Sequence, residues 1–332
     1  MAIYKLFSEK DTFISKHRST QNFGRDEILE VSNETILNSI NADVNRTLIK
    51  FETAQIDSLI NFISGSFSTS LRLFLANATI PSDYTIYSYP ISQSWDMGLG
   101  KAADNPITTN GVTWDTAPTY TTEYSGSQSF LYSDNKDINI DVTSIVEQWN
   151  SGSIDNNGLI LKLSDSIEDS STPLITKFFS MDTHTIYPPH LEFKWDDSSY
   201  STTLSEITSS NFSTSITNNR SEFLESSTYN FRIKSRDTYP SRAFSTTSVY
   251  TNSKSLPSTS YWALKDVKTE EMVIDFDTNY TKISCDNDSN YFKLHTNGLQ
   301  PERYYQILFK TLLSNGEVVI IDDKSNYFKI VR

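Results

Sequence analysis

Cysteine is nearly absent from this sequence. The 332 residues include one, Cys285, which excludes an intrachain disulfide and a zinc site built from cysteines. The four histidines are scattered and lack the spacing of a metal-binding motif such as HExxH. Cys285 lies in KISCDND, where a strand is expected to end. We therefore predict a buried structural thiol and not a catalytic nucleophile.

Long apolar runs and basic charge are also lacking. No run approaches the ~20 apolar residues that a membrane-spanning helix needs. The start, MAIYKLFSEKDTF, has neither the basic nor the apolar segment of a secretory signal. Lys and Arg number 28 against 41 Asp and Glu, which gives a net charge of −13. Because such a surface repels phosphate groups, we expect no nucleic-acid partner. Because long apolar runs and a signal segment are lacking, we also expect no membrane insertion and no classical secretion.

The residues that are abundant favour β-structure. Tyr (18) and Phe (19) are frequent, together with many Ser, Thr, Asn and Asp, a balance typical of strands and turns. Alternation of apolar and polar residues predicts strands in SLRLFLANA, DINIDV, GLILKLS and HLEFKW, and further strands at residues 47–51, 85–89 and 177–179. In HLEFKW, the alternation places Leu191 and Phe193 inside and His190 and Glu192 outside.

One segment of the first half is predicted to be helical. Residues 143–150 place Ile145, Val146 and Trp149 on one helical face, with Gly152 near the end. Ser144 and Glu147 have the spacing of a capping box.

A second domain is expected after the polar stretch DDSSYSTT. Strands resume beyond it, and Asn315-Gly316 between two apolar runs predicts a hairpin with a type I′ turn. Many short strands separated by turn residues indicate a β-sandwich. We predict an all-β chain with domains at residues 1–197 and 198–332, the second immunoglobulin-like.

Catalytic and metal-binding chemistry find little support in the sequence. Glycoside hydrolysis needs two carboxylates held about 5–9.5 Å apart, but Asp115, Asp141 and Asp165 lie at predicted strand ends or in loops, where turn capping explains them. No phosphate-binding glycine motif occurs. We predict that the protein is not an enzyme and needs no cofactor.

Calcium is the one ion for which candidate ligands exist. They are Asp11 with Glu9, and Asp286 with Asp288 in CDNDSN. The second pair lacks the glycine and the terminal glutamate of an EF-hand, and an exposed turn is the interpretation that we prefer for it.

A long polar stretch is the expected contact surface. Residues 92–129 show little alternation, and long loops on rigid sandwiches carry binding residues. Within it, VTWDTAP contains Trp114 and Asp115, and SQSWDMG contains Trp95. Each tryptophan is either packed in the core or rim of the sandwich or forms a platform that stacks on a sugar ring.

Motifs in both halves resemble known families. DTFISKHRSTQNFGRDEILEVS, RTLIKFETA, VTWDTAP, DVTSIVEQWNSGSIDNNGLILKLSD and FFSMDTHTIYPPHLEFKW follow the order seen in the DNRLRE (disaggregatase-related) family. This resemblance covers residues 1–197 and implies a jelly-roll similar to carbohydrate-binding modules. YTKISCDNDSNYFKL, GLQPERYYQILFK and DDKSNYFKIVR resemble a β-sandwich domain in structural proteins of tailed phages.

Together the resemblances imply a non-enzymatic structural protein of a tailed-phage virion, in the neck, collar or tail. Its partners would be other virion proteins, in a symmetric homo-oligomer. The C-terminal strand, with Tyr327, Phe328, Ile330 and Val331, is expected to pair with a neighbouring subunit by strand addition. The alternative is a module that binds a host surface polysaccharide through Trp95, Trp114 and Asp115.

Overall fold

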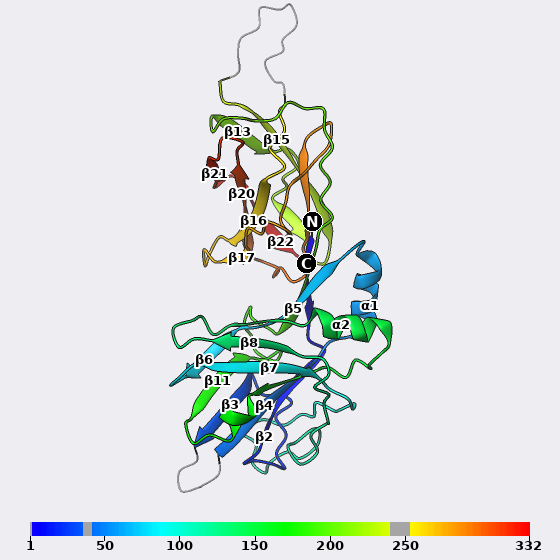
Figure 1. Cartoon of the computed structure of the whole chain (residues 1–332), viewed down its shortest axis with the longest axis vertical. Coiled ribbons are helices and arrows are strands. Elements are labelled where there is room, and N and C mark those ends of the chain that lie inside the picture. Colours follow the sequence, from blue (N-terminus) through cyan, green and yellow to red (C-terminus); the bar gives the residue numbers. More distant parts are fainter. Residues whose placement is uncertain (1, 36–41, 240–252) are drawn as a thin grey trace, which may run out of the picture. The chain divides into compact units, whose positions relative to one another are not determined.

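The computed structural model describes residues 2–35, 42–239 and 253–332, which form two compact units (Figure 1). The N-terminal unit comprises Lys5–Ile63 and Phe67–Phe193, and the C-terminal unit comprises Lys194–Arg332 with Met1–Tyr4 and Ser64–Ser66. Each unit is built from β-sheets in which most strands pair antiparallel, so the all-β prediction is confirmed. No helix within the described residues is both long and apolar enough to cross a membrane. The exact boundary at residues 197/198 stays a prediction.

The N-terminal unit is a β-sandwich. One sheet has the order β1-β12-β5-β9, and the other has the order β6-β11-β3-β4-β10-β7-β8, with β2 added to β4. The strands are β1 (Ala2–Phe7), β2 (Lys10–Ser15), β3 (Ile28–Thr35), β4 (Ala42–Lys50), β5 (Phe67–Leu73), β6 (Leu75–Thr79), β7 (Tyr84–Pro90), β8 (Gly126–Phe130), β9 (Ile138–Asp141), β10 (Leu159–Leu163), β11 (Leu174–Phe179) and β12 (His190–Trp195). Three short helices connect them: α1 (Thr53–Phe62), α2 (Thr143–Ser151) and α3 (Asp165–Glu168).

SLRLFLANA forms two strands in different sheets and not the single strand expected from its alternation. β5 ends at Leu73, and β6 begins at Leu75 in the opposite sheet. The change occurs at Phe74, whose carbonyl oxygen accepts a hydrogen bond from the N–H of Phe179 on β11 (3.1 Å). Leu75 is consequently only half-buried, whereas Leu71 and Leu73 are buried in the core.

The alternation in HLEFKW is also misleading. His190 and Glu192 were expected to face solvent, but both are buried. Aromatic side chains cover His190 on this face of β12. The rings of Phe7 and Phe74 lie 5.8 Å from the ring of His190. This burial lowers the pKa of His190 to about 3, so the imidazole is neutral at physiological pH.

The predicted helix is present as α2, with Ile145, Val146 and Trp149 buried and Gly152 in the left-handed region (φ 72°) at its end. The predicted capping box is wrong. The N-cap residue is Val142, which makes no side-chain cap bond. Asp141 Oδ1 instead accepts a hydrogen bond from the N–H of Thr143 (2.9 Å) at the start of the helix.

The C-terminal unit is a second sandwich. One sheet has the order β13-β15-β19-β18, and the other has the order β14-β22-β20-β16-β17, with β21 added to β20. The strands are β13 (Phe212–Ile216), β14 (Glu222–Leu224), β15 (Thr228–Asp237), β16 (Ser260–Asp266), β17 (Met272–Ile274), β18 (Ser284–Cys285), β19 (Asn290–His295), β20 (Tyr304–Leu312), β21 (Val318–Ile321) and β22 (Tyr327–Val331). Rings of Phe231, Trp262, Phe292, Phe309 and Phe328 fill the core between the sheets. Cys285 is buried at the end of β18, as predicted.

The predicted hairpin joins β20 to β21, but its turn differs from type I′. That turn needs a positive φ at both central residues, and among the described non-glycine residues only Ser226, Glu270 and Glu302 have one. Asn315 therefore lies outside the left-handed region and Gly316 alone lies in it (φ 84°). The loop has three residues, closed by the bond from Leu313 N to Glu317 O (2.9 Å).

Strand addition at the C-terminal strand is contradicted by the topology. β22 pairs with β20 on one edge and with β14 on the other. Phe328 and Ile330 are fully buried in the core, and only Tyr327 is exposed, with Val331 half-buried. Because both edges of β22 are already hydrogen-bonded within the chain, it offers no free edge to a neighbouring subunit.

Candidate functional site

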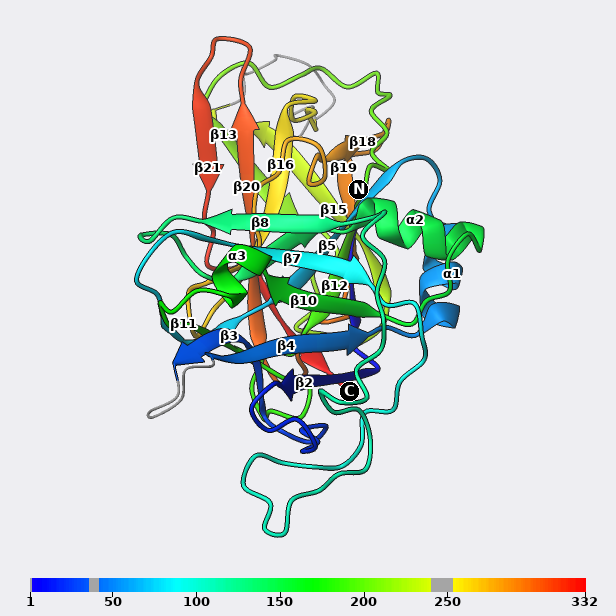
Figure 2. The ribbon, with the colours of Figure 1, turned by 60° about the horizontal axis from the view of Figure 1, so that its bottom comes forward.

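The outer face of the larger sheet of the N-terminal unit carries the candidate site. Figure 2 shows β8, β7, β10, β4 and β2 in succession, with α3 in front of them. In register, Leu48 on β4 lies opposite Ile160 on β10, which lies opposite Tyr89 on β7. Strand alternation places Arg46, Lys162 and Tyr87 on this same face, whereas their sequence neighbours, such as Leu161, point into the core.

The irregular chain between β7 and β8 covers part of this face with a small second core. Ile14, Leu48 and Ile160 contribute from the strands, and Ile91, Trp95 and Val112 contribute from the connection. Tyr89, Met97, Trp114 and Tyr120 pack against its margin and remain half-buried. The predicted contact loop at residues 92–129 is therefore anchored to the sheet, and its last residues belong to β8.

A buried amide joins several turns of this connection. Asn22 donates from Nδ2 to the carbonyl oxygens of Met97 and Val112 (2.8 Å each). Its Oδ1 accepts from the N–H groups of Gly24 (3.1 Å) and Gly100 (2.8 Å). The side chain is fully buried and uses all of its donors. The glycines are required here, because a Cβ at Gly100 would lie 2.2 Å from Asn22 O.

Four aromatic side chains gather beside this small core, and we call them the aromatic face: Tyr87, Tyr89, Trp114 and Tyr120. The ring centroids of Tyr87 and Tyr89 are 6.0 Å apart with nearly parallel planes (7°). Those of Tyr89 and Tyr120 are 5.4 Å apart at 25°. All four residues are half-buried, so each ring has packing support and also retains surface open to solvent.

An ion-pair cluster of Arg46, Lys162, Asp165 and Glu168 adjoins the aromatic face. Arg46 binds Glu168 through two bonds, Nε to Oε1 (3.1 Å) and Nη2 to Oε2 (2.5 Å). Lys162 Nζ lies 3.5 Å from the same carboxylate and also binds Asp165. The guanidinium carbon of Arg46 lies 5.0 Å from the ring centroid of Trp114, a cation–π contact. Arg46 therefore links the aromatic face to the cluster.

The pKa shifts of Arg46, Lys162 and Asp165 favour their charged forms. Burial opposes the charged form of Arg46, but its bonds to Glu168 raise the pKa overall. Burial likewise opposes the charge of Lys162, and the bond to Asp165 raises its pKa overall. The pKa of Asp165 is lowered by that same bond. Two cations and two carboxylates thus form a fixed, charge-balanced set of donors and acceptors beside the rings.

The three residues predicted to bind sugar lie in different environments. Trp114 belongs to the aromatic face, presented by a turn in which Thr113 Oγ1 and Thr116 Oγ1 are 3.1 Å apart. Trp95 is wrong as a sugar platform. It is only 7% exposed, its indole N–H donates to Asn157 O (2.8 Å), and Lys10 Nζ lies 4.4 Å from its ring centroid. Asp115 is exposed and accepts from Ser19 Oγ (3.1 Å), which fastens the turn.

The sequence reasoning missed Arg46, Lys162, Glu168 and the three tyrosines. A signal for two of them was available, since Tyr87 and Tyr89 are two residues apart on a predicted strand and must share its outer face. Arg46 and Glu168 are 122 residues apart, and no local pattern links them.

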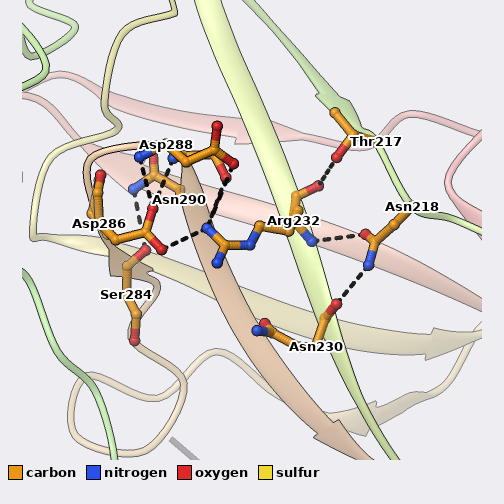
Figure 3. A network of polar contacts seen from close by, with 10 residues as sticks. Thr217, Asn218, Asn230, Arg232, Ser284, Asp286, Asp288 and Asn290 are labelled. Carbon is orange, nitrogen blue, oxygen red and sulfur yellow. Dashed lines mark hydrogen bonds and ion pairs between the residues drawn. The ribbon is translucent and has the colours of Figure 1, made fainter.

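The calcium candidates Asp286 and Asp288 surround an arginine (Figure 3). Arg232 Nη1 lies 2.6 Å from Asp286 Oδ2 and 3.8 Å from Asp288 Oδ2. Asp286 Oδ1 accepts from the N–H groups of Asp288 and Ser289. A guanidinium therefore takes the position that a cation would need, and this pair is not a calcium site in the structure.

The other candidate pair does not converge. Glu9 forms an ion pair with Lys50 (3.3 Å), whereas Asp11 is buried and accepts from the N–H of Met181 (2.8 Å). Burial raises the pKa of Asp11 to about 7, which the Met181 bond opposes. Across residues 2–35, 42–239 and 253–332, no three His, Cys, Asp or Glu side chains gather in a way that could hold a metal ion.

Comparisons with known proteins bear on the N-terminal unit. The family model of carbohydrate-binding module family 96 matches residues 2–166, just under half of the chain. This span contains the whole aromatic face. The match supports a carbohydrate-binding-like β domain in the N-terminal unit. No curated protein matches the chain.

Two solved structures show a faint likeness. One is the adhesin domain of Epf from Streptococcus pyogenes, at 9% identity and TM-score 0.19, covering 98% of this chain and 97% of that one. The other is the β-glucuronidase of Parabacteroides merdae, at 9% identity and TM-score 0.21, covering 98% of this chain and 36% of that one. Likenesses this faint carry no argument about fold or function.

Proposed function

We propose that the N-terminal unit binds a polysaccharide on its aromatic face, without cleaving it. The observation that carries this proposal is the group of half-buried rings on one face: Tyr87, Tyr89 and Tyr120 lie in succession, and Trp114 packs against the same small core and contacts Arg46. All four rings lie within the segment that matches the family 96 model. The specific sugar is left to the binding experiment below.

The geometry suits a sugar chain. One face of a pyranose ring carries C–H groups, which pack on the apolar face of an aromatic ring. Three successive rings span more than one sugar unit, since the centroids of Tyr87, Tyr89 and Tyr120 are separated by 6.0 and 5.4 Å. Packing against the small core holds the rings before any ligand arrives, which lowers the entropy cost of binding.

The acids on this face support binding and not hydrolysis. Glu168 is held by Arg46, and Asp165 is held by Lys162. A general acid needs a raised pKa, but the pKa of Asp165 is lowered by its lysine. The carboxylates on the face are therefore suited to orienting neighbouring side chains.

The test is a glycan array followed by titration of the best binder. Trp114→Ala and Tyr120→Ala should each weaken binding about tenfold or more, since each loses one stacking contact and its buried area. Tyr132→Ala is the matched control, because Tyr132 is 68% exposed and belongs to the loop after β8. Binding that is equal in all three variants, or no glycan binding by a folded protein, would remove the proposal.

The finer expectations stay predictions. Membership of the DNRLRE family rests on motif order alone, and a place in the neck or tail of a virion rests on the resemblance of the C-terminal segments. The family 96 match favours the carbohydrate-binding alternative over the structural role. Mass spectrometry of purified phage particles would test the virion role: a stoichiometric band supports it, and absence from the particle contradicts it.

A further inference from the structure

A pocket of about 230 Å³ lies on the outer face of the C-terminal unit, where β13 pairs with β15. Its lining consists of hydroxyl and basic residues: Ser213, Thr214, Ser215, Lys234, Ser235, Arg236 and Ser253. No carboxylate is among the described residues that line it. A pocket whose described lining contains basic residues and no acids is unusual on a chain with a net charge of −13.

The strand register places the basic and hydroxyl side chains together. Ser213 lies opposite Arg236, and Ser215 lies opposite Lys234, so these four side chains share one face of the sheet. It is the solvent face, because their alternating neighbours Phe231 and Ile233 are buried in the core. The bridge between Ser235 and Lys254 brings Ser253 alongside.

A neighbouring cation on the same strand has carboxylate partners, which the basic residues of this pocket lack among the residues that the structure describes. Arg232, two residues before Lys234, is neutralised by Asp286 and Asp288, as Figure 3 shows. Within the described part of the chain, no carboxylate forms an ion pair with Lys234 or Arg236. The nearest acid along the strand, Asp237, is already bound to Lys254 (2.6 Å).

Two like charges two residues apart on a strand repel each other, and an anion between them relieves that repulsion. Lys and Arg donate charge-assisted hydrogen bonds to oxyanions, and serine hydroxyls add neutral donors. We propose that this pocket is a second ligand site, which binds a sulfate or carboxylate group of an acidic polysaccharide. The site lies in the C-terminal unit and does not depend on the aromatic face.

Nucleic acid also carries oxyanions, but it is disfavoured as the ligand. Its phosphates form a continuous line of charge that would meet the acidic remainder of the surface, whereas a sulfate or carboxylate on a sugar is an isolated charge among hydroxyls. The choice between the two ligand classes is part of the test.

The full chain is titrated with dextran sulfate, carboxymethyl dextran, neutral dextran and a single-stranded oligonucleotide. We expect one or both charged dextrans to bind in a salt-dependent way and to be displaced by inorganic sulfate. The double variant Lys234→Gln/Arg236→Gln should bind at least about tenfold more weakly, through the loss of two charge-assisted bonds. Tight binding of the oligonucleotide alone, or binding of neutral dextran with unchanged affinity in the double variant, would overturn the assignment.

The matched control is Lys268→Gln/Lys324→Gln, which removes two positive charges from exposed positions of the same unit. An equal loss of binding in this control would show that net charge alone is responsible, and would also overturn the proposal. Trp114→Ala should leave this binding intact, so failure of the aromatic-face proposal and failure of this one can be told apart. A thermal melt of each variant verifies that it is folded.

Discussion

Replacing Asn22 by Asp should release the connection that carries Trp114. The substitution keeps the size of the side chain and the acceptor bonds from Gly24 and Gly100, but it replaces the amide donor by a second oxygen. That oxygen would face the carbonyl oxygens of Met97 and Val112, which lie 2.8 Å from Nδ2. The change therefore removes two hydrogen bonds and places like partial charges in contact at a fully buried position.

The cost follows from these two carbonyl groups. A buried polar group left without its partner costs roughly 1–3 kcal/mol, so two of them cost about 4 kcal/mol. For a unit of this size, that corresponds to a fall in Tm of roughly 8–16 °C. Protonation restores one donor, so the pKa of the new carboxyl is raised in the folded state. The destabilisation should then be smaller at low pH and should grow as the pH rises through that pKa.

Differential scanning calorimetry from pH 4 to 8 measures the effect, and titration with a bound glycan measures its consequence for the aromatic face. Asn77→Asp is the control, because Asn77 is exposed on β6, and it should melt with the wild type. An Asn22→Asp protein with wild-type Tm and wild-type glycan affinity would refute the view that this amide positions the loop.

Two further predictions concern buried charges. The carboxyl of Asp11 has a pKa of about 7 against an ordinary 3.8, so it contributes stability below about pH 4 that is lost as the pH rises to 7, up to roughly 4 kcal/mol. Urea unfolding of Asp11→Asn should show this slope removed, and an unchanged slope would contradict the assignment. Arg46→Met should lower the free energy of unfolding by about 3–5 kcal/mol, because it removes the two hydrogen bonds that Arg46 donates to the buried Glu168. Arg46→Met/Glu168→Gln should recover much of that loss, and additive losses in the cycle would show that the two side chains are not coupled.

Much of the fold was predictable because alternation marks which residues of a strand face the core. Leu159, Leu161 and Leu163 lie in the core as their spacing indicates, and Gly152 ends α2. The alternation pattern failed at Phe74, where the chain changes sheets. The strand that pairs with β6 after this change is β11, which lies about 100 residues later in the sequence. The pattern failed at His190 because the rings of Phe7 and Phe74, both distant in the sequence, cover that side chain.

The sites were less predictable than the fold. Trp114 was found because an aromatic in a turn is conspicuous, but its value as a platform depends on Arg46 behind it. In the sequence, the acids of CDNDSN resemble cation ligands. In the structure, Arg232, 54 residues earlier, lies between them. Ion-pair partners are chosen by the tertiary fold, and a single sequence holds no record of that choice.

The indole N–H signals of the tryptophans, followed by NMR while the best glycan from the array is added, test sugar binding at the aromatic face most directly. Trp95 is an internal reference, because its N–H is buried in a bond to Asn157. We expect the Trp114 signal to shift in a saturable way while the Trp95 signal stays in place. A shift of Trp95 with none at Trp114, or saturable binding that moves neither signal, would contradict the account.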